Sequence, residues 1–218
     1  MPSDLSGVTG QAQSSSMMST PRRLAACATA LAIALLGATA HAERNPSLAG
    51  QTIVQSVEGG RHTKEYGRNG QLIYEVIERQ RSRGGKTATE AVEREWSEDG
   101  KPLRDQTFLG GNEIKGTTWY LNGQVKETRV DQSLREPGGL PGKYVERFSD
   151  QGKLQSAGVF QGQFRPVGTH REYDPAGKLK REVTYDARGN RSSERSYDAS
   201  GAVIGSERFL PDGSRIRD

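Results

Sequence analysis

Aromatic, aspartate and glycine positions recur at a fixed spacing in the C-terminal part of the chain. Four segments show this most clearly, each with a glycine four residues after its aromatic residue, and they begin at Tyr173, Tyr185, Tyr197 and Phe209. These aromatic residues stand 12 residues apart. The same aromatic-to-glycine spacing occurs earlier in the chain, at Tyr66, Trp96 and Phe148. A fixed period of this kind predicts a repeat architecture.

Each repeated segment contains the residues of a β-hairpin turn. Asp favours the first position of a type I turn, and Gly three residues later adopts the left-handed conformation that closes a three-residue loop with a bulge. If Gly177 has this conformation, Asp174 closes the turn with Lys178, and Tyr173 lies opposite Leu179. The same rule predicts further cross-strand pairs, namely Tyr66 with Leu72, Phe108 with Ile114, Phe148 with Leu154, Phe160 with Pro166, Tyr185 with Arg191, Tyr197 with Val203 and Phe209 with Arg215.

The period also predicts which side chains share a face of the sheet. Side chains alternate along a strand, so residues an even number of positions apart in one register lie on the same face. Because the period of 12 is even, we expect one half-apolar face and one polar face. The half-apolar face is expected to contain Tyr173, Leu179, Val183, Tyr185, Tyr197, Val203 and Phe209. The predicted fold class is therefore all-β, an antiparallel meander of repeated β-hairpins in an elongated single-layer sheet.

Two segments interrupt the repeat. Residues 79–91 are rich in Arg, Gly and Thr, and residues 131–143 contain the run Pro-Gly-Gly-Leu-Pro-Gly. Both are predicted to be exposed loops, which serve either as plain connections or as carriers of function. Helical character is limited to a turn or two over residues 88–96.

The composition agrees with a thin architecture. The 218 residues are 32% hydrophobic and 27% charged, with 27 glycines, so the chain has too few large apolar residues for a thick core. The net charge of +4 comes from 31 basic and 27 acidic residues, which are mostly interleaved. Interleaved charge is typical of a solvated surface, and we expect no nucleic-acid partner.

The N-terminal region has the order of a secretory signal peptide. Arg22 and Arg23 precede an apolar run over residues 24–36, and small residues follow up to Ala42. Cleavage is expected after Ala42, which predicts a periplasmic or secreted protein. Residues 1–16 are expected to lie upstream of the true start, because Met17 or Met18 would begin a signal of normal length.

These observations predict three parts of the chain. Residues 1–42 are the signal peptide, residues 43–60 form a flexible tether, and residues 61–218 form the β-repeat domain. No second apolar stretch follows the signal, so we expect no integral membrane segment after cleavage.

Catalytic and metal-binding motifs are weak or missing. The single cysteine, Cys27, lies in the expected signal peptide, and the remaining histidines, His62 and His170, are far apart, with His170 expected to have a packing or surface role. Gly85-Lys86-Thr87 resembles the end of a phosphate-binding loop, but Gln80 occupies the position of the first glycine. No carboxylate pair is singled out for glycoside chemistry. We therefore predict a non-enzymatic protein with no catalytic residues, metal site or cofactor.

Two segments resemble a known repeat family. Gly116 to Glu127, and Gly168 to Tyr173 continuing into Gly177-Lys178-Leu179, resemble MORN-variant repeats of the YwqK type. The Tyr-Asp segments more weakly resemble the repeats of Rhs proteins. The first resemblance implies a repeated hairpin sheet used for binding, with an antitoxin role proposed for the YwqK type and no catalytic residues.

The aromatic face is the predicted ligand-binding surface. Its expected residues are Tyr173, Tyr185, Tyr197 and Phe209, with Arg191 available to stack beside an aromatic ring. The preferred partner is a protein of unknown identity. The alternatives are an immunity-type neutraliser of a toxin and a module that binds cell-wall polysaccharide. A curled sheet that buries the rings against each other is an equally good explanation for any single aromatic residue.

Overall fold

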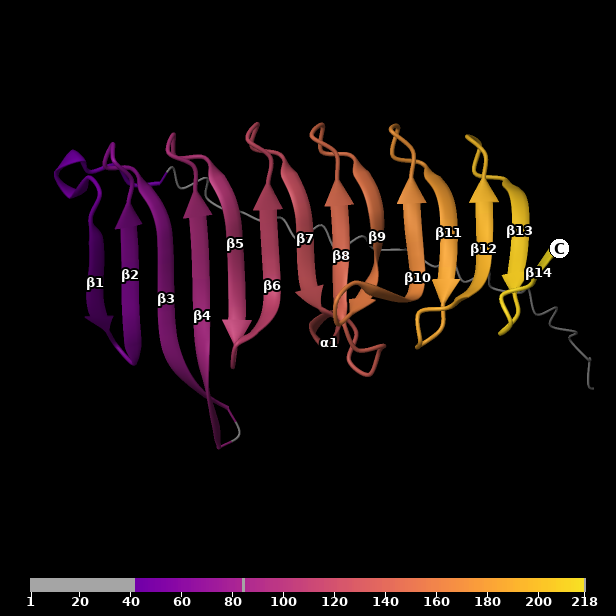
Figure 1. Cartoon of the computed structure of the whole chain (residues 1–218), viewed down its shortest axis with the longest axis horizontal. Coiled ribbons are helices and arrows are strands. Elements are labelled where there is room, and N and C mark those ends of the chain that lie inside the picture. Colours follow the sequence, from indigo (N-terminus) through magenta and orange to yellow (C-terminus); the bar gives the residue numbers. More distant parts are fainter. Residues whose placement is uncertain (1–41, 84, 218) are drawn as a thin grey trace, which may run out of the picture. The chain divides into compact units, whose positions relative to one another are not determined.

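The computed structural model describes residues 42–83 and 85–217, so the predicted signal peptide lies outside the described residues except for Ala42. Fourteen antiparallel strands form one sheet in which neighbours in the chain are neighbours in the sheet (Figure 1). The strands are β1 (Thr52–Val57), β2 (Gly60–Tyr66), β3 (Leu72–Arg83), β4 (Lys86–Trp96), β5 (Pro102–Leu109), β6 (Asn112–Trp119), β7 (Val125–Asp131), β8 (Lys143–Phe148), β9 (Leu154–Gln161), β10 (Arg165–Tyr173), β11 (Leu179–Tyr185), β12 (Arg191–Tyr197), β13 (Val203–Phe209) and β14 (Arg215–Arg217).

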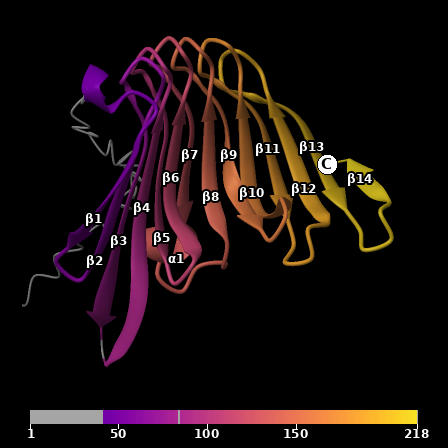
Figure 2. The ribbon, with the colours of Figure 1, turned by 60° about the vertical axis from the view of Figure 1, so that its left-hand side comes forward.

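The prediction of an all-β meander is confirmed. The two helical elements in the described part of the chain are short, a 3₁₀ turn η1 (Pro46–Leu48) and a four-residue helix α1 (Gln132–Arg135). Figure 2 shows the strands following one another in a single layer. None of the described helices is long and apolar enough to cross a membrane.

The turn chemistry predicted from the Asp-x-x-Gly segments is also confirmed. The amide of Asp174 donates to Lys178 O at 2.8 Å, and the amide of Gly177 donates to Asp174 O at 2.8 Å. Gly177 has φ of 85°, the left-handed conformation that the closing position requires. As a result, Tyr173 lies opposite Leu179.

Six of the other predicted pairs are present, and one is not. The pairs Tyr66–Leu72, Phe148–Leu154, Phe160–Pro166, Tyr185–Arg191, Tyr197–Val203 and Phe209–Arg215 occur as predicted. Phe108 instead lies opposite Glu113, because Gly110 and Gly111 form a two-residue turn. Both glycines have positive φ, which this tighter turn requires.

The prediction that the four C-terminal aromatic residues share a face is wrong. Arg171 pairs with Glu182, which pairs with Arg195, so these three side chains share a face. Tyr173 and Tyr197 each lie two residues from a member of this row and belong to the same face, whereas Tyr185 lies three residues from Glu182 and belongs to the opposite one. Phe209 lies three residues from Ser206, which opposes Arg195, and therefore shares the face of Tyr185. We call these two surfaces the Tyr173 face and the Tyr185 face.

The physical reason is the extra residue in each bulge. Glu172 pairs with Arg181 and Tyr173 pairs with Leu179, so Lys180 is an additional residue on β11. One extra residue per turn reverses the alternation of side chains each time. An even period of 12 therefore alternates the faces, and the true repeat is two strands long.

Apolar residues consequently form a row on each face rather than covering one face. The turns after β2, β4, β6, β8, β10 and β12 lie at one edge of the sheet, which is the upper edge in Figure 1. Following the pairing across the sheet places the aromatic residues before these turns on the Tyr173 face, namely Tyr66, Trp96, Trp119, Phe148, Tyr173 and Tyr197. Each aromatic ring faces Leu, Pro or Val across the turn, and such cross-strand pairs stabilise the register.

Neighbouring turns at this edge also contact each other. The side-chain amide of Asn69 donates to Glu98 O at 2.7 Å, and that of Asn122 donates to Asp150 O at 2.7 Å. Lys178 Nζ donates to Ala199 O at 2.6 Å in the same manner. These bonds connect successive hairpins in addition to the strand ladder.

The loop predicted over residues 79–91 is a long hairpin, and the helical turn predicted over residues 88–96 is strand β4. Polar and β-branched residues pair across it, with Gln80 Nε2 donating to Thr89 Oγ1 at 3.0 Å and Arg81 pairing with Glu90 at 2.8 Å. Lys86 begins β4 directly after the turn at Gly85. The strand, loop and helix order of a phosphate-binding loop is therefore not formed at this position.

Residues 43–60, predicted as a flexible tether, instead form the first part of the sheet. β1 pairs with β2 along its whole length. Before it, the amide of Asn45 donates to Gly70 O at 2.8 Å, and that of Gly50 donates to Gly67 O at 3.0 Å. This segment closes over the first turn, where Tyr66 and Leu72 are both buried. The irregular, polar sequence of this segment gave no sign that it caps this end of the sheet.

Candidate functional site

The predicted binding residues do not form one surface. Tyr173 and Tyr197 lie on the Tyr173 face, Tyr185 and Phe209 lie on the Tyr185 face, and all four are half-buried. Arg191 is exposed, and its guanidinium carbon lies 5.9 Å from the centre of the Phe209 ring. It also pairs with Glu194 at 3.4 Å. Stacking of this arginine on an aromatic ring is observed, but with Phe209 rather than with its direct partner across the turn.

Tyr185 packs against a histidine. The His170 ring lies between Phe160, at 4.7 Å between ring centres, and Tyr185, at 5.1 Å, in edge-to-face geometry. His170 Nε2 is bonded to Val159 O at 2.8 Å. Burial lowers the pKa of His170 below its ordinary value of 6.5, which favours the neutral ring. These contacts give His170 the packing role expected from the sequence. One side of the Tyr185 ring is therefore in contact with His170 and is not available to a ligand.

A second candidate site is a hollow on the Tyr173 face. Within residues 131–143, predicted as an exposed loop, the segment 132–142 folds into α1 and a return loop that lie over β8 to β10. The Asp131 carboxylate caps α1 by accepting from the Ser133 amide at 3.0 Å. The loop is anchored at its far end, where Gln161 Nε2 donates to Pro141 O at 2.8 Å. The hollow between this segment and the strands is partly open to solvent and has a volume of about 590 Å³.

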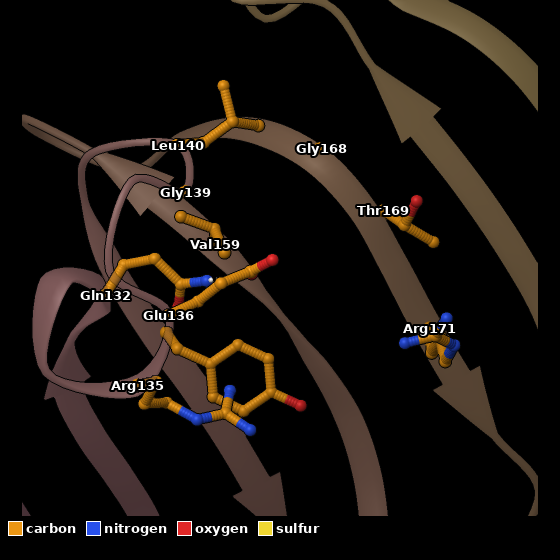
Figure 3. Close-up of a pocket in the computed structure, with 10 residues that line it drawn as sticks. Gln132, Arg135, Glu136, Gly139, Leu140, Val159, Gly168, Thr169 and Arg171 are labelled. Atoms are coloured by element: carbon orange, nitrogen blue, oxygen red, sulfur yellow. Dashed lines mark hydrogen bonds between the residues drawn. The ribbon is translucent and has the colours of Figure 1, made fainter. Parts of the chain in front are cut away.

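Polar groups from two elements line this hollow. Figure 3 shows Gln132, Arg135 and Glu136 on one side and Thr169 and Arg171, from β10, on the other. The Arg135 guanidinium lies 3.4 Å from the centre of the Tyr144 ring. Arg171 Nε pairs with Glu182 at 3.0 Å. The hollow therefore has two arginines and one glutamate at its border, with Leu140 and Val159 providing its apolar wall.

A third candidate surface lies on the last strands. We call it the C-terminal patch and define it as Val203, Ile204 and Ile216, which are 54%, 68% and 43% exposed. Val203 opposes Tyr197, and Ile216 opposes Arg208, so both belong to the Tyr173 face. Ile204 is the extra residue of the bulge, and because it precedes Gly205, which opposes Ser196, it points to the same face.

Charged side chains elsewhere are mainly engaged with each other. On the Tyr173 face, Glu75 is bonded to His62 at 2.7 Å and to Arg94 at 2.9 Å. On the Tyr185 face, Arg181 donates to Glu194 at 2.6 Å, and this hydrogen bond lowers the pKa of the Glu194 carboxyl below its ordinary value. Within residues 42–83 and 85–217, no three His, Cys, Asp or Glu side chains are grouped as metal ligands would be.

The sequence contained signals for the two sites that the pattern analysis missed. Asp131 followed by Ser133 is a helix-capping arrangement, and Leu134 and Leu140 mark the following loop as more than a polar connection. At the chain end, consecutive Val203 and Ile204 after a turn glycine indicate a bulge with two apolar side chains. Neither signal shows which surface remains open, because that depends on contacts between distant segments.

Comparison with known proteins supports the repeat reading over one hairpin. Residues 166–187 match the family model described as MORN repeat variant, and they comprise most of β10, the turn after Tyr173 and β11. No curated protein matches the chain significantly.

Solved structures with some similarity include S. aureus TarM. One is a point mutant of TarM in complex with fondaparinux, α-GlcNAc-glycerol and UDP, and another is described as the crystal structure of TarM. Each is 13% identical over 78% of this chain, with a TM-score of 0.20. The chain spans 22% of the length of each of these solved chains. A TM-score this low does not establish a shared fold. The similarity that bears on this chain is therefore that of a single hairpin to the MORN repeat variant.

Proposed function

We propose that this chain is an exported, non-enzymatic binding protein that contacts a protein partner through the C-terminal patch. The observation that carries the proposal is the exposure of the adjacent Val203 and Ile204, with Ile216 exposed on the same face opposite the other end of β13. Apolar side chains grouped on a surface commonly mark an interaction site, whereas scattered ones do not.

The two ends of the sheet support this assignment because they differ. At the β1 end, η1 and the segment around it cover Tyr66 and Leu72, so the terminal hairpin is closed. At the β14 end, the described residues place no such segment over Tyr197 and Val203. Repeat proteins cover their terminal units with polar residues when those units face only water. An uncovered apolar end is therefore suited to contact with another molecule.

The charge around the patch indicates the chemistry of the partner. Arg195 belongs to the same face as the patch, and among the described residues of β12 to β14 this face has no carboxylate. Complementary charge steers association and disfavours wrong partners. A partner surface with apolar residues surrounded by Asp or Glu fits this arrangement. A toxin neutralised by this chain would be one protein of that description.

Site-specific crosslinking tests the proposal. A photo-crosslinking amino acid replaces Ile204 in one variant and Val54 in another, because Val54 is also exposed, at 59%, but lies on β1. Both variants are expressed in the native host and irradiated, and crosslinked proteins are identified by mass spectrometry. We expect one protein captured at position 204 and not at position 54.

The captured protein is then purified for a binding measurement. Ile204→Ser should weaken its binding by about tenfold or more, the size of effect seen at interface hot spots, and Val54→Ser should leave it unchanged. Equal capture at both positions, or equal binding by both variants, contradicts the proposal. Capture of a second copy of this chain alone replaces it with self-association.

A further inference from the structure

We propose that the hollow between α1 and strands β8 to β10 binds a small organic carboxylate that also has an N–H or O–H donor. This inference is independent of the protein-binding proposal, because it concerns other residues and another class of ligand. It rests on the placement of two guanidinium groups and on one buried oxygen atom.

The first argument is the charge of the border. Arg171 is already paired with Glu182 at 3.0 Å. Arg135, in contrast, has no carboxylate partner among the described residues, although Glu136 follows it in the chain. Its guanidinium is instead held flat against the Tyr144 ring, 3.4 Å from the ring centre. Stacking limits the movement of this cation while its N–H groups stay available to an anion.

The second argument is an oxygen without a partner. Gln132 is 7% exposed, and its Nε2 donates to the Glu136 carboxylate at 3.1 Å. Because a carboxylate only accepts hydrogen bonds, the amide must direct its NH₂ group to Glu136, which leaves Oε1 for another donor. Oε1 is buried and has no hydrogen-bond partner in the described structure. A buried acceptor without a donor is costly, so a ligand N–H or O–H that meets Oε1 after a rotation of the Gln132 side chain would stabilise the site.

The third argument is the shape and rigidity of the hollow. Its volume of about 590 Å³ suits a monosaccharide derivative or a short peptide. The loop that covers it is fixed on the sheet, since Leu140 approaches Gly168 so closely that a Cβ there would lie 3.1 Å from its Cδ1. Val167, in the strand below, is completely buried. A preformed hollow loses little conformational entropy on binding.

The required ligand chemistry has two natural sources. An acidic amino sugar and the C-terminal residue of an acylated peptide both have a carboxylate and an N–H donor. The probes are N-acetylmuramic acid for the first source and N-acetyl-alanyl-alanine for the second. Their matched controls lack the carboxylate, and they are N-acetylglucosamine and the C-terminal amide of the same dipeptide.

Binding to the full chain is measured by ¹H–¹⁵N chemical-shift titration. We expect at least one carboxylate probe to bind with a Kd of about 1 mM or lower, with shifts confined to residues 132–142 and the neighbouring part of β10. Its matched control should bind about tenfold more weakly or not at all, because charge-assisted hydrogen bonds to arginine are lost. The probe that binds identifies the source.

Variants connect the binding to the named atoms. Arg135→Gln and Gln132→Leu should each weaken the bound probe by about tenfold, whereas Arg188→Gln, in an exposed turn outside the hollow, should not. The dispersed spectrum of each variant shows that it is folded. The inference is overturned if neither carboxylate probe gives saturable shifts, if the controls bind equally well, or if Arg135→Gln binds like the unmodified chain.

Discussion

Two valines on the same face of the sheet are expected to differ sharply in their contribution to stability. Val167 is 0% exposed and Val203 is 54% exposed, and both belong to the Tyr173 face. Replacing either by alanine makes the same chemical change, a loss of two carbon groups from the side chain. The difference between the two sites therefore reports mainly how deeply each valine is packed.

The magnitude for Val167 follows from its burial. Two buried carbon groups contribute about 1.6 kcal/mol of transfer free energy, and the cavity they leave adds about 1 kcal/mol. For Val203, which is half in water, the cost is expected to be below about 0.5 kcal/mol. We therefore expect Val167→Ala to reduce the free energy of unfolding by about 2 kcal/mol more than Val203→Ala does.

The assay is urea denaturation followed by far-ultraviolet circular dichroism, with both variants and the unmodified chain in one buffer. The slope with denaturant should be the same for all three proteins, which shows that they expose similar surface on unfolding. Equal destabilisation by the two substitutions would refute the reasoning. It would mean that Val203 is packed against other residues, and the C-terminal patch would lose its main support.

Three further outcomes are expected. Gly177→Ala should cost about 1 kcal/mol of stability in denaturant melts, because φ at this position is 85°. Gly205→Ala is the control and should be close to neutral, because Gly205 has a negative φ and open space around it. Equal effects of the two substitutions would contradict the turn assignment. The His170 imidazole should titrate below pH 6.5 by NMR, and a midpoint at or above 6.5 would show that the ring is not buried. Because the folded pKa is lowered, the contribution of His170 to stability is present above pH 6.5 and is lost as the pH falls towards the folded pKa. The Glu194 carboxyl has a folded pKa below 4.5 because of its bond to Arg181. Its contribution to stability is therefore present above pH 4.5 and is lost as the pH falls through the folded pKa. Glu194→Gln should flatten this part of the profile of stability against pH, and an unchanged profile would count against the ion pair.

The sequence was sufficient for the local structure of the repeat. Asp174 and Gly177 form a turn whose hydrogen bonds recur at Asp186 and Asp198, so the pairing of Tyr173 with Leu179 could be predicted from the turn residues. The prediction for Phe108 was wrong because the turn after it is different: two adjacent glycines form a shorter turn and change the pairing.

The distribution of residues between the two faces depends on the number of bulge residues in each strand, which the 12-residue period does not show. Each bulge adds one residue to a strand, and Lys180 is the residue that moves Tyr185 to the face opposite Tyr173. Because the extra residue belongs to the strand ladder rather than to the loop, it is invisible in the 12-residue spacing. The predicted aromatic surface was therefore divided into two rows.

The candidate sites depended on contacts between distant segments. The fold of residues 132–142 over β8 to β10 buries Gln132 and places Arg135 on Tyr144, and no local pattern specifies that packing. Similarly, the closure of the β1 end by residues 43–51, and the exposure of Val203 and Ile204 near the β14 end, become visible only when the whole sheet is formed. Local propensity determines elements, whereas exposure is a property of the assembled sheet.

Hydrogen–deuterium exchange on the purified complex with the crosslinked partner tests the protein-binding surface most directly. The amides of β13 and β14, which end the sheet, should exchange more slowly in the complex than in the free chain, while those of β1 and β2 should be unchanged. Protection limited to β1 through β5, or no protection over residues 203–217, would contradict binding through the C-terminal patch.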